Sequence, residues 1–364
     1  MSKIKKILTA NLKPGMMVAE NTYTADNQLV IQENTSLTPE IIQRLRQYSI
    51  LSVKILFTEE ETVSTNTQET TAAEPSYFDR VQNTPEFKEF KAEFSNSLNA
   101  FQEKLNDIVV RNTTDVVDSM LNDVESVLNK SRNPLHLLDM MQCMRGFDDL
   151  TYTHSLNVAL ISHVIGTWLN LSEEELTVLT TCGMLHDIGK LKIPAEIITK
   201  PGKLTDQEFR LIQAHPQLGY DILKDKAVNS RVKKAALQHH ERFDGKGYPN
   251  RLNGDNIDYF AAIVTIADVY DAMTADRCYR KGICPFEVIA HLEKERSLYE
   301  PGVLYLFMKR TVEAYINTEV LLSNNERGKV VLLNSNQPSR PMVLTDKGMH
   351  DLSRESQLRI VELL

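Results

Sequence analysis

Apolar residues recur at helical spacing over most of this chain. Between residues 78 and 128 they fall three or four positions apart, on either side of a polar break at 112–114: Phe87, Phe90, Phe94, Leu98, Phe101, Leu105 and Ile108, then Val116, Met120, Val124 and Val127. Such a stripe is more typical of a helix face buried in a core than of any other structure. The alternative is a dimerising stalk, because a coiled-coil seam needs the same kind of spacing.

Residues 134–315 carry a pattern that predicts an all-helical bundle. One helix is expected over residues 153–169, and capping boxes at 172–175 and 205–208 begin two more. The first of these ends at His186-Asp187, and the second ends before Pro216. Further helices are expected over 219–223, 231–240, 259–275 and 285–296. Helices in a bundle bring side chains from several elements to a common centre.

The two ends of the chain show strand patterns. At the N-terminal end, strands are expected over 17–23, 29–31 and 51–57, with a turn at 25–28 and a helix from Thr38-Pro39 to about Tyr48. At the C-terminal end they are expected over 320–322, 329–333 and 341–344. The fold class is therefore mainly α. The predicted organisation is a small α/β module (1–58), a linker (59–76), a helical connector (77–133), the helical domain (134–315) and a small β element (316–364).

Composition narrows the classes of function. The chain has 364 residues and a net charge of −8, which argues against a nucleic-acid duplex or an anionic membrane as its main partner. Lysines near the N-terminus are followed by no apolar run, and no stretch approaches the roughly 18 apolar residues of a membrane span. The four cysteines form no CxxC pair, so reduced thiols in a cytoplasmic protein are expected.

A histidine and an aspartate adjoin at the end of an apolar helical run, as His186-Asp187. Neighbouring helical side chains diverge by roughly 100°, yet both can point into one cluster. A carboxylate has two oxygens and can bridge two cations, whereas an imidazole binds one. This donor set suits iron, manganese or zinc. A lone pair of this kind also occurs by chance, so the prediction depends on the rest of the chain.

Other potential ligands also fall in apolar helices: His154, His215, His239, His240 and Asp268. Polar side chains in such surroundings are costly unless something satisfies them, and a metal centre would do so. The other four histidines (His136, His163, His291 and His350) are expected to be ordinary core or surface residues.

The motifs together resemble a known family. They are His-Asp-Ile-Gly-Lys at 186–190, His-Pro at 215–216, His-His-Glu-Arg-Phe-Asp-Gly-Lys-Gly-Tyr-Pro at 239–249, and the segment 268–280. This combination resembles the HD-GYP family, whose bacterial members are metal-dependent phosphodiesterases of cyclic di-GMP within the HD superfamily. The resemblance covers about residues 136–315. Residues 1–58 resemble, more loosely, a small domain often found ahead of it.

The resemblance implies a site with two divalent metal ions, iron or manganese, with nickel, cobalt or zinc as alternatives. One metal would be held by His154, His186, Asp187 and Asp268, and the second by His215, His239, His240 and the bridging Asp187. Lys190 would meet the scissile phosphate, Tyr248 would border the ligand, and Arg277 and Arg280 would grip its phosphates. Gly245 and Gly247 would let the loop approach a ligand, and Asp271 would support the site from behind.

One position departs from the family pattern. Some members bind a third metal through a glutamate four residues before the first histidine of the site, and this chain has Leu150 there. The sequence therefore predicts two metals and not three.

The expected reaction is hydrolysis of cyclic di-GMP to linear pGpG, and onward to GMP, through a hydroxide that bridges the metals. Asp187 and Lys190 would be the catalytic residues. Two alternatives stay open at this stage: an HD-type phosphohydrolase acting on another nucleotide, and a non-catalytic receptor of a cyclic dinucleotide or a partner protein. Expected partners are cyclic di-GMP, a second copy of the chain through the connector, and signalling proteins.

Overall fold

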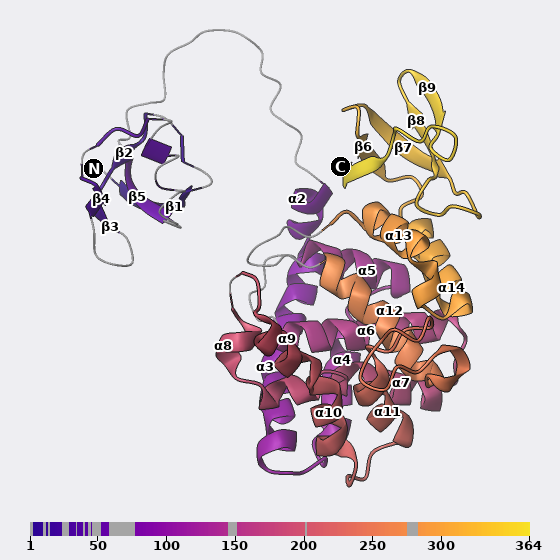
Figure 1. Ribbon diagram of the computed structural model, residues 1–364. Helices are drawn as coiled ribbons and strands as arrows, with labels where there is room; N and C mark the ends of the chain where they lie inside the picture. The colour runs from indigo at the N-terminus through magenta and orange to yellow at the C-terminus, as the bar shows by residue number, and fades with distance from the viewer. Residues whose placement is uncertain are drawn as a thin grey trace. The chain divides into compact units, whose positions relative to one another are not determined.

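The chain folds into two compact units, residues 1–74 and 75–364, each with its own apolar core (Figure 1). The computed structural model describes residues 3–9, 12–13, 15–23, 29–33, 35–38, 41–42, 45, 52–57, 77–144, 151–200, 202–274 and 283–364. The predicted linker at 59–76 lies outside these residues.

The first unit is built on a three-stranded antiparallel sheet. Its strand order is β1 (Lys3–Leu8), β5 (Ser52–Phe57) and β2 (Met17–Val18), and β3 (Thr22–Tyr23) pairs with β4 (Leu29–Ile31). The strands expected over 17–23, 29–31 and 51–57 are therefore present, although the first is divided in two. β1 was not predicted, because its lysine-rich sequence lacks the alternation of a half-buried strand. Ile41, Ile42 and Leu45 are helical; the expected turn and the rest of that helix lie outside the described residues.

The second unit is mainly helical. Its helices are α2 (Tyr77–Gln82), α3 (Pro85–Val110), α4 (Val117–Leu128), α5 (Pro134–Cys143), α6 (Tyr152–Trp168), α7 (Glu173–Leu185), η2 (Ile188–Lys192), α8 (Ala195–Ile198), α9 (Asp206–Gln213), α10 (His215–Leu223), α11 (Ser230–Gln238), η3 (Gly254–Asn256), α12 (Tyr259–Thr274), α13 (Pro285–Lys294), η4 (Arg296–Leu298) and α14 (Pro301–Glu313). α6, α7 and α12 are buried on nearly all sides and pack against one another. Both predicted capping boxes are present, with Ser172 and Glu175 at α7 and Thr205 and Glu208 at α9.

The apolar stripe of α3 and α4 is buried within the chain's own core. Phe90, Phe94 and Phe101 are each at most 1% exposed and belong to the same cluster as the apolar residues of α6, α7 and α12. Helices 77–128 and the helices that follow them thus share one core. The buried-face interpretation of the stripe is correct, and the stripe no longer offers a seam for a dimerising stalk.

A five-stranded antiparallel sheet completes the second unit. Its order is β10 (Ile360–Leu363), β6 (Glu319–Leu322), β7 (Arg327–Leu332), β8 (Met342–Thr345) and β9 (Gly348–Asp351). Val320, Val330 and Val343 point from the sheet into the core shared with the helices. The three expected strands are present, whereas β9 and β10 were not predicted, since each is short and carries little alternation.

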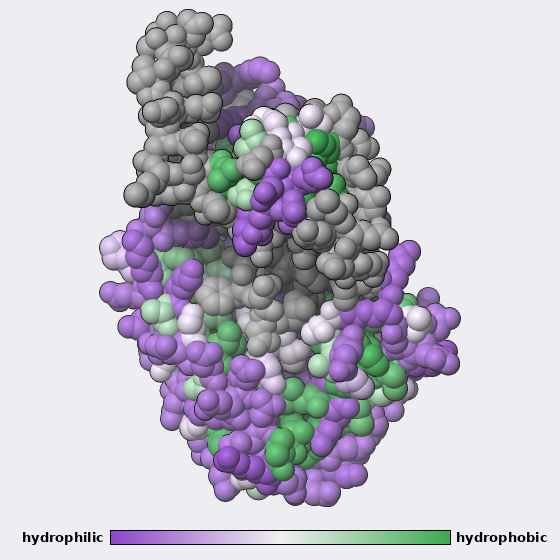
Figure 2. Space-filling model, turned by 90° about the vertical axis from the view of Figure 1, so that its left-hand side faces the viewer, coloured by the Kyte–Doolittle hydropathy of each residue, from purple (hydrophilic) through white to green (hydrophobic). Residues whose placement is uncertain are grey.

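Figure 2 shows one face of the molecule, on which hydrophilic residues predominate among the coloured residues and hydrophobic residues form smaller groups between them. Within the described part of the chain, no helix has both the length and the apolar character needed to cross a membrane.

Candidate metal centre

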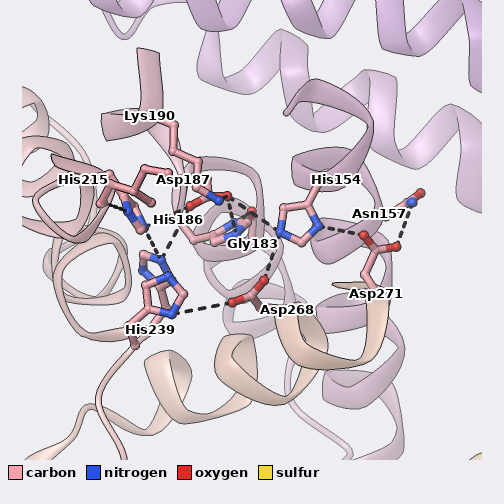
Figure 3. A network of polar contacts seen from close by, with 12 residues as sticks. His154, Asn157, Gly183, His186, Asp187, Lys190, His215, His239, Asp268 and Asp271 are labelled. Atoms are coloured by element: carbon pink, nitrogen blue, oxygen red, sulfur yellow. Dashed lines mark hydrogen bonds and ion pairs between the residues drawn. The ribbon is translucent and has the colours of Figure 1, made fainter. Parts of the chain in front are cut away.

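Five helical segments bring the seven predicted ligands into one cluster, and Figure 3 labels all of them except His240. α6 contributes His154, the end of α7 contributes His186 and Asp187, and α10 begins with His215. His239 and His240 follow α11, and Asp268 lies within α12. All are buried except His240, which is partly exposed. The cluster exists because α6, α7 and α12 cross at the centre of the bundle, while α10 and α11 close one side of it.

Asp187 lies between two sets of imidazoles. Its Oδ1 is 3.2 Å from His215 Nε2 and 3.6 Å from His239 Nε2. Its Oδ2 is 3.3 Å from His186 Nε2 and 3.7 Å from His154 Nε2. Each carboxylate oxygen therefore faces a different set, which is the arrangement that a bridging ligand needs.

The imidazoles present their lone pairs to this centre. The Nδ1 atoms of His186, His215 and His239 lie 2.7, 2.6 and 3.0 Å from the carbonyl oxygens of Gly183, Ile212 and Ala235. A carbonyl can only accept, so each Nδ1 carries a proton and donates it, which leaves Nε2 as an acceptor. Fixing the imidazole in this way is how proteins orient histidine ligands.

The donor atoms fit divalent cations. Three groups have ligand atoms that all lie within 4.8 Å of one another: His215, His239 and His240; His154, His186 and Asp268; and His186, Asp187 and His239. In the described part of the chain, His186 Nε2 and Asp187 Oδ1 are buried with no hydrogen-bond partner. His215 Nε2 and His239 Nε2 face each other at 3.0 Å. Lone pairs that converge at this distance repel one another, and a cation between them would remove the repulsion.

The protonation states also suit metal binding. Burial raises the pKa of Asp187, but the Lys190 ammonium and the neighbouring histidines outweigh it and hold the pKa well below its usual range. Burial lowers the pKa of His215, and burial together with His239 lowers that of His240 further. The Asp187 carboxylate is thus ionised and the His215 and His240 imidazoles are neutral, which are the forms of these groups that coordinate metal.

In the absence of a metal, the pKa of His154 is raised, in contrast to the pKa values of His215 and His240. Burial alone lowers its pKa, but hydrogen bonds to Asp268 and Asp271 raise it to about 9. Its Nε2 lies 2.9 Å from Asp268 Oδ1, and its Nδ1 lies 2.6 Å from Asp271 Oδ2. A cation bound at Nε2 would take the place of the proton that this imidazole shares with Asp268.

Two of the expected substrate-contacting residues lie beside the centre. Lys190 contacts Asp187 Oδ2 through its ammonium group. The Tyr248 ring packs on His240, with ring centroids 4.8 Å apart and an angle of 30° between the planes. Burial and the carboxylates of Asp268 and Asp187 raise the pKa of Tyr248, so its hydroxyl stays neutral. Arg277, Arg280 and Leu150 lie outside the described residues.

Sequence reasoning overlooked Glu241, the residue after the histidine doublet. Its side chain is 2% exposed, and its carboxylate accepts hydrogen bonds from the backbone amides of Asn250 (2.6 Å) and Leu252 (2.9 Å). These bonds fix the loop that carries Tyr248 against the doublet. The signal available in the sequence was a glutamate placed after the histidine doublet and before a glycine-rich loop.

Gly247 is required by the packing of the loop on its own chain. A Cβ at this position would lie 2.5 Å from the Arg242 nitrogen and 2.5 Å from Glu241 Cα. The role expected for this glycine in the approach of a ligand stays a prediction. Gly245 has a φ of 74°, which any other residue except asparagine or aspartate would adopt only with strain.

The four histidines expected to lie outside the site do so. His163 Nδ1 is 3.0 Å from Thr180 Oγ1, and His136 Nδ1 accepts from the Arg132 amide at 3.2 Å. His291 and His350 pair with Glu295 and Glu355 at 3.1 and 3.0 Å.

Comparison with known proteins agrees with this geometry. A family model described as an HD domain matches residues 116–303, slightly more than half of the chain. The chain is 36% identical over 201 residues to the cyclic di-GMP phosphodiesterase PA4108 of Pseudomonas aeruginosa, covering 55% of this chain and 48% of that protein. It is 40% identical over 148 residues to the cyclic di-GMP phosphodiesterase response regulator RpfG of Xanthomonas campestris pv. campestris, covering 39% of each.

Two further matches are a relative that is named for a different substrate and, separately, a protein of known structure. The chain is 36% identical over 162 residues to the 3′3′-cGAMP-specific phosphodiesterase 2 of Vibrio cholerae, covering 44% of this chain and 31% of that protein. The chain spans half or less of the length of these curated relatives. The structure of Bd1817, a HDG"Y"P protein from Bdellovibrio bacteriovorus, superposes with a TM-score of 0.50 at 17% identity, covering 84% of this chain and 98% of that one. It supports the fold.

Proposed function

The chain belongs to the HD domain family, and from this membership we propose that it is a metal-dependent phosphodiesterase that hydrolyses cyclic di-GMP to linear pGpG, and onward to GMP. Its resemblance to the HD-GYP family is confirmed by the relatives named above. The observation that carries the proposal is the position of Asp187, whose two oxygens each face a separate set of histidine nitrogens 3.2–3.7 Å away.

The proposed centre holds two divalent cations. His154, His186, Asp187 and Asp268 would hold one, and Asp187, His215, His239 and His240 the other. When bound, such cations supply positive charge to the phosphodiester and activate water near neutral pH. Iron or manganese suits a set of imidazoles and carboxylates best, with nickel, cobalt or zinc as alternatives.

The chain's own side chains supply orientation and charge. Lys190 places an ammonium beside Asp187, where it would approach a phosphate oxygen and stabilise the charge that develops on it in the transition state. The neutral Tyr248 hydroxyl and ring lie over His240, where they would border the substrate. We propose that Arg277 and Arg280 bind the phosphates, since the planar guanidinium suits that role.

A second candidate substrate is 3′3′-cGAMP. Three Vibrio cholerae relatives that are named as 3′3′-cGAMP-specific are 36–40% identical to this chain over 144–162 residues, which is as similar as the relatives named for cyclic di-GMP. Both dinucleotides carry the same phosphodiester, so the metal ligands alone do not discriminate between them. The discrimination would come from contacts to the bases.

The test is a substrate panel with the full chain. The protein is purified without oxygen and loaded with iron, manganese or nickel. It is then incubated separately with cyclic di-GMP, 3′3′-cGAMP and cyclic di-AMP. We expect pGpG from cyclic di-GMP at the highest rate, and no product from His186→Ala. His163→Ala is the matched control, because that histidine bonds to Thr180 outside the centre. Tight binding without turnover under all three metals would favour a receptor instead. A cytoplasmic location and signalling partners stay predictions. A dimer also stays a prediction, and it would have to use a surface other than the buried stripe of α3 and α4.

A further inference from the structure

A cavity of about 720 Å³ lies between α13, α14 and the loop 336–340, which belongs to the connection from β7 to β8. Its walls are the last turn of α13, η4, the first turns of α14 and the loop 336–340, and it shares no lining residue with the metal centre. Figure 1 shows α13 and α14 beside the sheet. The volume lies within the roughly 300–1,000 Å³ typical of small-molecule sites.

One wall of the cavity is held in place before any ligand binds. The Glu293 carboxylate on α13 accepts hydrogen bonds from both the amide and the hydroxyl of Ser339. The Arg340 guanidinium donates to the carbonyl oxygens of Leu352 and Leu358 at 3.0 and 3.2 Å. The loop is thus bonded to α13 on one side and to the segment between β9 and β10 on the other. A ligand would therefore meet a wall that is already ordered.

Two cations at the cavity have no partner. Lys294 and Arg296 both line it, and in the described part of the chain neither side chain forms an ion pair or a hydrogen bond. The one lining carboxylate, that of Glu293, is already engaged by Ser339. The cavity therefore has a local positive charge although the whole chain has a net charge of −8. Both side chains are exposed at the same concave site and are therefore free to bind a phosphate group.

The facing wall is apolar and includes an aromatic ring. Leu304 and Met308 are 2% and 6% exposed, and Tyr305, one residue along α14, is 47% exposed. Tyr305 makes no ring contact or hydrogen bond within the described residues. An exposed aromatic side chain beside a thioether offers a surface on which a flat heterocycle can pack.

We propose that this cavity binds a nucleoside monophosphate, with the phosphate on Lys294 and Arg296 and the base against Tyr305 and Met308. Charge at one wall and an apolar, aromatic surface at the other match the two parts of such a ligand. A ligand in this position would touch both the helices and loop 336–340, so binding would stabilise the sheet on the bundle. The proposal depends on neither the metal centre nor the proposed reaction.

The test is calorimetry on the full chain with GMP, AMP and inorganic phosphate as probes. We expect both nucleotides to bind at least about tenfold more tightly than phosphate, because stacking on an aromatic ring adds to the phosphate contact. Lys294→Ala and Arg296→Ala should each weaken nucleotide binding at least tenfold. Tyr305→Ala, at an exposed position that leaves the core intact, should weaken nucleotide binding but leave phosphate binding unchanged.

Controls separate this cavity from the metal centre. Asp187→Asn should retain the nucleotide binding that the Lys294 and Arg296 variants lose, and Arg310→Ala, whose guanidinium pairs with Glu313 outside the cavity, should bind the nucleotides as the natural chain does. Amide hydrogen exchange at 336–340 should slow when GMP is added. Equal affinity for GMP and phosphate, unchanged binding in the Lys294 and Arg296 variants, or loss of binding in Asp187→Asn would each overturn the proposal.

Discussion

His154 Nδ1 and Asp271 Oδ2 lie 2.6 Å apart and join α6 to α12 directly behind the metal centre (Figure 3). Asn157, one turn further along α6, donates to the other oxygen of Asp271 at 2.8 Å. Asp271 is thus held by two contacts from a single helix. Because Asp271 takes up Nδ1, the other nitrogen of His154 is directed at Asp268 and the centre.

We expect Asp271→Asn to weaken metal binding by about 10- to 100-fold, because the carboxylate that orients His154 and makes it more basic is lost. Competition with a chromogenic chelator measures the affinity. Asn157→Ala should have a smaller effect in the same direction, since Asp271 itself remains. Unchanged affinity in Asp271→Asn would show that His154 is oriented by other contacts.

Asp187 is expected to act in both metal binding and turnover, whereas Lys190 is expected to act in turnover alone. Asp187→Asn should lose both metal and turnover, because the ionised oxygens that face both sets of histidines are gone. Lys190→Ala should keep its metal but lower kcat by about 10²- to 10³-fold, the usual cost of removing one group that stabilises the transition state. Elemental analysis and a turnover assay on the same preparations separate the two effects. A Lys190→Ala protein without metal would contradict this division.

The chain is expected to bind two metal ions rather than three. The described ligands form two sets around Asp187, and the sequence has Leu150 where some HD-GYP members have a glutamate. Elemental analysis of protein purified without oxygen should give two equivalents per chain. His240→Ala, which removes a ligand from one set alone, should reduce this value toward one. A value of three in the natural chain would point to a ligand beyond the seven residues of the two sets.

Glu241 is expected to contribute to stability through the loop that it holds. A hydrogen bond to a charged group is worth about 1.5–3 kcal/mol, and this buried carboxylate accepts two from backbone amides. Glu241→Gln should therefore lower the free energy of unfolding by about 2–3 kcal/mol and raise KM, since Tyr248 lies on the same loop. Urea unfolding and steady-state kinetics check the two effects. Glu295→Gln, which alters a half-exposed pair with His291, is the control and should change neither.

The stability contributed by Glu208 should depend on pH. Hydrogen bonds from Lys200 and from the backbone and hydroxyl of Thr205 lower its pKa from 4.5 to about 2. A carboxyl with a lower pKa in the folded state stabilises that state above the unfolded value, and the contribution is lost as pH falls through the folded value. Glu208→Gln should therefore be less stable than the natural chain at pH 7, with a gap that narrows below about pH 4.5. Denaturant unfolding at pH 7 and pH 3.5 tests this, and a gap that widened on acidification would contradict it.

Local signals in the sequence predicted much of the helical part of the fold. They gave no separate helix for α5, α8 or α14, and they placed His215 at the end of a helix where the structure begins α10. The capping boxes at Ser172 and Thr205 begin α7 and α9 as predicted, because a cap depends on residues only three positions apart. The buried stripe of α3 was also correct, since the period of apolar residues is a property of the helix itself. β1, β9 and β10 were missed because a short strand forms only where another strand pairs with it. In β1, for example, Lys3 pairs with Phe57, which lies far away along the chain.

The candidate metal ligands could likewise be selected from the sequence, because histidines and carboxylates in apolar helices are costly to bury unless a cation or a charged partner satisfies them. Only the tertiary structure decided the directions in which these side chains point and the distances between them. It directs one oxygen of Asp187 toward His215 and the other toward His186. It also brings the Glu241 carboxylate to the loop whose amides it accepts hydrogen bonds from, and it packs Gly247 closely against other parts of the chain. Finally, it forms a cavity between α14 and the loop 336–340. These relations join segments that are distant along the chain, and they arise only when helices pack around a common core, because a side chain's local sequence fixes its chemistry but not its partner.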